Sequence, residues 1–152
     1  MAIRWKQAVA AGVVGTAAMT VVGLFVAPMM GIPRMNPAEM LATQMGGVLA
    51  LGWAAHFMIG AVLALGYAVV APFIAGLATL RGALYALAPF LLAQLVVLPM
   101  MGMPLFSGSV VLALGSMLGH LVYGGVLGAV YGAVREPVTA AAAGVVASAH
   151  SH

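Results

Sequence analysis

The sequence has no cysteine and no aspartate, and its only acidic residues are Glu39 and Glu136. The absence of cysteine excludes disulfides, thiolate metal sites and thiol catalysis. With two glutamates so far apart, the chain has no carboxylate pair for acid and base catalysis or for metal binding inside an apolar region. Phosphate-binding loops and nucleophile elbows are also missing. We therefore predict that the protein is not an enzyme.

Charged residues of either sign are scarce. The five basic residues stand singly along the chain, and they are Arg4, Lys6, Arg34, Arg81 and Arg135. Because they form no basic stripe, we expect no binding of nucleic acid. Hydrophobic residues make up 65% of the 152 residues, and the mean hydropathy is +1.21. This composition leaves too little polar surface for a water-soluble globule and predicts a protein of the lipid bilayer.

Four apolar stretches reach the length of roughly 20 residues that a membrane-spanning helix needs. They cover about residues 8–30, 48–71, 82–103 and 110–134. The predicted fold class is an all-α integral membrane four-helix bundle. Four basic residues flank these stretches on one side and only Arg34 lies on the other. The positive-inside rule therefore predicts a multi-pass protein with both termini in the cytoplasm.

The sequence carries one pattern twice. The segment PMMGIP at residues 28–33 recurs as PMMGMP at residues 99–104, and HxxxGxVLxxxY begins at His56 and again at His120. Proline, histidine and tyrosine in matching order are hard to obtain by chance in an apolar chain. We interpret the pattern as a tandem duplication of a two-helix unit.

The duplication sets the predicted domain organisation. A single four-span membrane domain covers residues 1–135, with repeat one at about 8–71 and repeat two at about 82–135, and a flexible tail covers residues 136–152. Each repeat supplies two spans, so the two halves enter the membrane in the same orientation as parallel repeats.

Two local features distinguish the halves. In the first connection, Asn36 and Glu39 have the spacing of a helix cap, Pro37 suits the first helical position, and residues 46–47 are a glycine pair suited to a stop. We predict a short interfacial helix there, with apolar side chains that touch lipid. Pro89 predicts a kink in the third span, which the first span lacks.

Small residues follow each repeated histidine at helical spacing. They are Gly60, Ala64 and Ala68 after His56, and Gly124, Gly128 and Gly132 after His120. Such faces let two helix backbones approach closely in lipid. We predict that they pack helices within the bundle, and a homodimer surface is the alternative.

The two repeated histidines are ionisable residues placed well inside the predicted hydrocarbon region. The other polar residues in the spans include Gln94, Ser116, Tyr67 and Tyr131. Three roles are open for the pair: hydrogen bonds that lock the helices, axial ligation of a haem b, or a polar constriction in a proton or solute path. By pseudo-symmetry, we expect each histidine to be the partner of the other.

We expect no bound cofactor or metal. Haem b at His56 and His120 is one alternative, although close packing of the two small-residue faces on each other would leave no room for the macrocycle. Copper is another, because thioether and imidazole suit Cu(I). The residues behind that alternative are Met29, Met30, Met100, Met101 and Met103, with His150 and His152 in the tail.

The segments GWAAHFMIGAVLALGY, PMMGMP and GHLVYGGVLGAVYG resemble a family of small bacterial four-helix integral membrane proteins of unknown function. The resemblance runs from the first span to Gly132 and implies a multi-pass bacterial membrane protein, with no implied substrate or cofactor. The localisation that we predict is the bacterial inner membrane. We predict a non-catalytic accessory subunit or assembly factor of a larger inner-membrane complex, respiratory or photosynthetic. Its partners would be lipid and either other membrane subunits or a second copy. The alternatives are a proton or small-solute channel or carrier lined by the two histidines, and a bis-histidine haem b electron-transfer protein.

Overall fold

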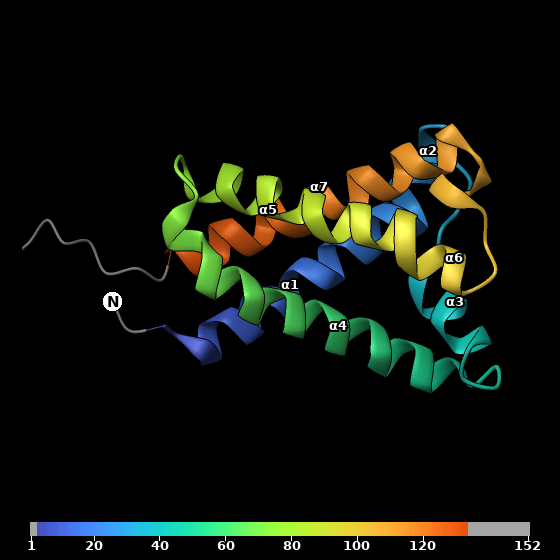
Figure 1. Cartoon of the computed structure of the whole chain (residues 1–152), viewed down its shortest axis with the longest axis horizontal. Helices are drawn as coiled ribbons and strands as arrows, with labels where there is room; N and C mark the ends of the chain where they lie inside the picture. Colours follow the sequence, from blue (N-terminus) through green and yellow to red (C-terminus); the bar gives the residue numbers. More distant parts are fainter. Residues whose placement is uncertain (1–2, 134–152) are drawn as a thin grey trace, which may run out of the picture.

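The structure is a computed structural model that describes residues 3–133, and these residues form helices and loops with no strand. Four long helical runs make a bundle (Figure 1). They are Trp5–Met29, Leu49–Phe73, Ala78–Met100 and Val110–Gly132, and each is long and apolar enough to cross a membrane. The predicted all-α four-helix bundle is confirmed. The predicted tail, residues 136–152, lies outside the described residues.

The first and third runs have the same internal construction. In the first, α1 (Trp5–Val21) continues through a π turn, η1 (Val22–Val26), into α2 (Ala27–Met29). In the third, α5 (Ala78–Leu92) continues through the π turn η3 (Ala93–Val97) into α6 (Leu98–Met100). The π turn therefore occurs at the same place in both halves, although Pro89 precedes only the second. The proline alone does not cause the departure from α-helical geometry.

Both runs also end in the same way. Gly31 and Gly102 each have φ of +79°, the left-handed conformation that glycine adopts without steric cost. The backbone N–H of Ile32 donates to the Ala27 carbonyl at 3.0 Å, and the matching bond in the second half, from Met103 to Leu98, is 2.9 Å long. This is the Schellman ending of a helix. The repeated PMMGxP segments are thus two copies of one helix stop.

The predicted short helix in the first connection is confirmed as α3 (Pro37–Thr43). The Asn36 side-chain oxygen accepts hydrogen bonds from the backbone N–H groups of Ala38 and Glu39, at 3.1 and 3.4 Å. The buried face of α3 rests on α4 (Leu49–Val70), where a Cβ at Gly52 would meet the Ala38 carbonyl. The helix is therefore part of the bundle wall as well as a connection.

The extent of packing differs between pairs of the four runs. Helix α1 packs against both α4 and α7 (Val110–Ala133), α7 packs extensively against α5, and α4 contacts α5 only sparsely. A short 3-10 turn, η2 (Ala71–Phe73), leads from α4 toward α5, and η4 (Leu105–Gly108) leads from α6 toward α7. In Figure 1 the α4–α5 connection lies at one end of the bundle, and α2, α3 and α6 lie at the other.

The small-residue faces pack within each half. Gly12 on α1 lies against α4, where an added Cβ would come within 2.6 Å of the Ala64 Cβ, and a Cβ at Gly60 would overlap the Thr16 hydroxyl. On α5, a Cβ at Gly82 would overlap the Gly124 carbonyl. The remaining predicted packing residues are placed as follows: Ala68 is buried in the core, and Gly128 and Gly132 lie against Ala78. The faces of α4 and α7 thus each meet the other helix of their own half.

Candidate functional site

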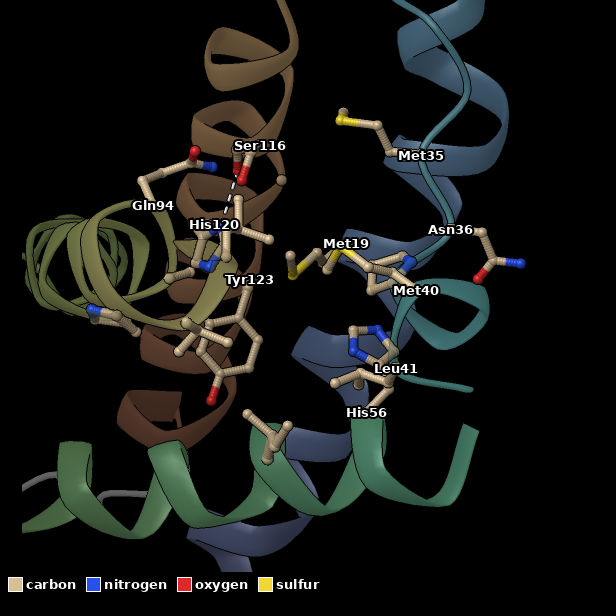
Figure 2. Close-up of a pocket in the computed structure, with 18 of the residues that line it drawn as sticks. Met19, Met35, Asn36, Met40, Leu41, His56, Gln94, Ser116, His120 and Tyr123 are labelled. Carbon is tan, nitrogen blue, oxygen red and sulfur yellow. Dashed lines mark hydrogen bonds between the residues drawn. The ribbon is translucent and has the colours of Figure 1, made fainter. Parts of the chain in front are cut away.

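A cavity of about 560 Å³ lies between the two halves of the bundle (Figure 2). Side chains from α1, α3, α4, α5, η3 and α7 line it, most of them apolar. His56 and His120 both line the cavity, so the structure brings the two repeated histidines to one space. Figure 2 shows them on different walls, His56 on α4 and His120 on α7.

His56 is buried and bonds to the neighbouring helix of its own half. Its Nε2 lies 3.0 Å from the Thr20 hydroxyl oxygen. Thr20 donates its single hydroxyl proton to the Thr16 carbonyl at 2.8 Å, so the hydroxyl can only accept from the imidazole. The proton of a neutral His56 therefore sits on Nε2, and Nδ1 keeps an unshared lone pair.

His120 has the complementary arrangement. Its Nδ1 lies 2.8 Å from the Ser116 carbonyl, which can only accept, so Nδ1 carries the proton. The lone pair of a neutral His120 is then on Nε2. The Phe90 ring packs edge-on against the imidazole, with the ring centroids 5.7 Å apart. Each half thus contributes one nitrogen that can accept a hydrogen bond.

The expectation that the histidines are each other's partners is not what the structure shows. Within residues 3–133, each imidazole is hydrogen bonded inside its own half, His56 to Thr20 and His120 to Ser116. The physical reason is proximity: each bond joins groups on one helix or on two tightly packed helices, whereas the cavity lies between the wall that carries His56 and the wall that carries His120. The pair is therefore placed around a shared space rather than locked together.

The other predicted polar residues divide between the cavity and the core. Gln94 and Ser116 line the cavity, and the Gln94 side-chain oxygen accepts from the Ser107 hydroxyl at 3.1 Å. Ser107 has φ of +60°, an uncommon conformation for a residue with a side chain. Tyr67 and Tyr131 lie in the core cluster, with their rings edge-on at 5.8 Å.

The structure adds cavity residues that sequence reasoning missed. They are Thr16, Met19, Met35, Met40 and Tyr123. Thr16 carried a usable signal, because Gly12, Thr16 and Thr20 follow each other at intervals of four inside an apolar span, where polar residues are informative. Met19 and Met35 carried none, because methionine is a common apolar filler.

The methionines at the ends of α2 and α6 do not form a site with the histidines. Met29 and Met100 are 87% and 81% exposed, and Met30 is also exposed. Of the five methionines behind the copper alternative, Met103 lines the cavity. Met40, on the predicted interfacial helix, lines it as well, so α3 faces the cavity with part of its apolar surface.

Among residues 3–133, the cavity lining carries no lysine or arginine, and Glu39 on α3 is its one charged residue. Glu39 lies 3.6 Å from Arg34 in an exposed ion pair. A haem would bring two propionate groups that need cationic or well-hydrated partners, and this lining offers no cation to them. The arrangement suits a neutral molecule with apolar surface and hydrogen-bonding groups.

Comparison with known proteins places the chain in a family without assigning it a role. Residues 4–142 match a family of unknown function, DUF6789, and the chain belongs to this family. The match extends past Gly132, where the resemblance seen in the sequence ended. No curated protein and no solved structure matches the chain significantly.

Proposed function

We propose that this member of DUF6789 is a membrane-embedded carrier that binds a small neutral solute in the cavity between its two halves. The observation that carries the proposal is the pair of imidazoles, one from each half, that line one cavity with an unshared lone pair each. A binding site between two repeats is the arrangement expected of membrane carriers built by duplication.

The distribution of basic residues supports an orientation for this carrier in the bacterial inner membrane. Arg4 donates to the Tyr131 carbonyl at 3.3 Å and Arg81 to the Ala71 carbonyl at 3.4 Å, so both lie at the end opposite α3. By the positive-inside rule this end faces the cytoplasm. The cavity, bordered by α3, then lies toward the outer face.

The competing proposal is an accessory subunit of a larger inner-membrane complex. Its support in the sequence is the small size of the chain, the lack of catalytic groups and of sizeable soluble domains, and small-residue faces suited to helix docking. Since Gly60, Gly124 and Gly128 pack inside the halves, these faces no longer favour a docking role over a carrier.

The test is native mass spectrometry of the protein extracted gently from its own membranes, followed by identification of small molecules that leave the particle. We expect a bound non-lipid molecule in the wild-type protein and in the control Met58→Leu, at an exposed position on α4. The double variant His56→Leu/His120→Leu and the variant Met40→Trp, which narrows the cavity from α3, should each lose about tenfold in occupancy.

Met40→Trp keeps the test informative if the double variant fails to fold, because Met40 lies outside the four long runs. Equal small-molecule content in all four proteins would overturn the proposal. If the protein also remains bound to a large complex in stoichiometric amount after extraction, that result together with equal small-molecule content would favour the accessory subunit.

A further inference from the structure

Three hydroxyl groups at or near the His56 wall of the cavity already donate to the protein backbone. Thr16 donates to the Gly12 carbonyl at 2.8 Å, Thr20 donates to the Thr16 carbonyl, and Tyr123 donates to the Gly60 carbonyl at 2.7 Å. These hydroxyl protons are therefore committed to the protein backbone. At His56, the imidazole nitrogen left for a ligand is Nδ1 with its lone pair.

The His120 side differs because it mixes donors and acceptors. Gln94 accepts from Ser107 through its oxygen, which leaves its amide nitrogen as a donor, and the Ser116 hydroxyl also lines the cavity. Figure 2 shows both side chains close to His120. A ligand group there can donate to His120 and accept from the amide, as a hydroxyl does.

The two histidines occupy matching positions relative to the contact between the halves. Tyr123 lies three residues after His120, and Gly60 lies four residues after His56, so the hydrogen bond from Tyr123 to Gly60 joins α7 to α4 about one helical turn beyond each imidazole. Gly60 and Tyr123 both line the cavity, so this bond is part of the cavity wall. The site therefore has one imidazole acceptor on each of two pseudo-symmetric walls.

We propose that the cavity binds a para-dihydroxy aromatic ring, the head group of a membrane quinol, and prefers it to the oxidised quinone. The ring carries two hydroxyl donors at opposite ends, which match one acceptor from each half. It is neutral, which suits a lining whose described residues include no lysine or arginine, and it is soluble in lipid. This inference rests on the proposed carrier function and names its ligand.

The remaining lining fits a flat aromatic group. The thioethers of Met19 and Met40 line the cavity, and methionine sulfur makes favourable contacts with aromatic rings. Figure 2 shows Met19 between the two imidazoles in this view, and Met40 on the α3 side of His56. The volume of about 560 Å³ falls in the range of roughly 300–1,000 Å³ that small-molecule sites occupy.

Preference for the reduced form arises mainly at His56. A quinone carbonyl placed there would turn its own lone pairs toward Nδ1 and leave that acceptor unpaired. An unsatisfied buried acceptor of this kind corresponds to a loss of about tenfold in affinity. At the His120 side, a carbonyl could still accept from Gln94, so the penalty there is smaller.

The test is equilibrium dialysis of the wild-type protein in lipid nanodiscs under argon against three probes with one ring skeleton. Tetramethyl-1,4-benzenediol has two donors, tetramethyl-1,4-benzoquinone has none, and the dimethyl ether of the diol is a redox-inert molecule without donors. Empty nanodiscs give the partition background. We expect the diol to bind about tenfold tighter than either of the other two.

Two variants test whether His56 causes the preference for the diol over the quinone. His56→Gln supplies an amide donor at that wall, so it should bind the quinone better and bring the affinity ratio close to one, while Met58→Leu should keep the wild-type ratio. As a second readout, the ¹⁵N signal of the unprotonated His56 nitrogen should shift when the diol binds.

Equal affinity of the wild-type protein for all three probes, or an affinity ratio unchanged by His56→Gln, would overturn the quinol proposal. In that case the carrier proposal survives if the occupancy of a co-purified small molecule still drops in Met40→Trp. It fails together with the quinol proposal if Met40→Trp changes the occupancy of no such molecule.

Discussion

At the scale of single residues, Thr20 holds His56 in the orientation that gives the cavity its acceptor. The hydroxyl of Thr20 bonds back to the Thr16 carbonyl, one turn earlier on α1, and is thereby fixed as an acceptor for the imidazole N–H. Such a relay selects one tautomer of a buried histidine. The state of His56 is thus determined by α1, a helix on which it does not lie.

Replacing Thr20 with valine tests this relay. Thr20→Val keeps the side-chain shape but removes the acceptor, which leaves the buried His56 N–H unpaired. We expect a loss of about 1–3 kcal/mol in the free energy of unfolding, measured by denaturant titration in detergent micelles. The control is Thr43→Val on α3, where the hydroxyl is exposed and the change should stay within about 0.5 kcal/mol. Equal effects of the two substitutions would contradict the relay.

The histidines could be identified from the sequence as site residues, but their partners could not. His56 and His120 are informative because ionisable groups are rare inside apolar spans. Which group each imidazole meets depends on how α1 crosses α4 and on how far apart the halves stand. Those distances come from packing, and a repeat in the sequence suggests symmetry without giving the separation.

At the scale of helices, glycines fix the closest contacts in the second half. Gly124 on α7 lies against the backbone of α5, and an added Cβ there would overlap the Gly82 carbonyl. The adjacent Gly125 points elsewhere, since its added Cβ would meet only the Thr79 methyl group at 3.5 Å. Neighbouring positions on one helix therefore have opposite tolerance for a side chain.

This contrast gives a prediction with an internal control. Gly124→Ala must push α5 and α7 apart, and we expect it to lower the free energy of unfolding by about 1–3 kcal/mol. Gly125→Ala adds a methyl group that makes an ordinary van der Waals contact, and it reduces the backbone entropy of the unfolded chain. It should be neutral or stabilising by about 0.5–1 kcal/mol. Thermal unfolding of both variants in the same detergent measures the difference. Comparable destabilisation by the two alanines would show that α5 and α7 do not pack in this way.

Helix-scale features were predictable where they depend on local chemistry. The cap at Asn36 was predicted from its side-chain hydrogen bonds. The PMMGxP segments were recognised only as a repeat, and their role as helix stops follows from glycine's access to positive φ. The π turns at Val22–Val26 and Ala93–Val97 were not predicted. No residue type specifies a π turn, and the run Val22–Val26 contains no proline.

At the scale of the whole molecule, tyrosines join the halves from the middle of the bundle toward the α4–α5 connection, and the cavity extends from there toward α3. Tyr85 on α5 donates to the Leu63 carbonyl on α4 at 2.7 Å, and Tyr123 on α7 donates to the Gly60 carbonyl. The ring of Tyr67 meets both Tyr85 and Tyr131 across the same contact. A carrier with its cavity toward the outer face must release contacts of this kind to expose the solute to the cytoplasm.

Because the chain has no cysteine, a single introduced thiol can report this release. Leu63→Cys lines the cavity beside the tyrosine contact, and in the resting protein a membrane-impermeant maleimide added from the Arg4 side should label it slowly. Adding Tyr85→Phe and Tyr123→Phe removes two hydrogen bonds of about 0.5–1.5 kcal/mol each, which should raise the labelling rate about tenfold. Tyr131→Phe, which keeps its ring contact with Tyr67, is the matched control and should leave the rate unchanged. If the double phenylalanine variant labels no faster than this control, the tyrosine contact is a permanent part of the core and the halves do not separate there.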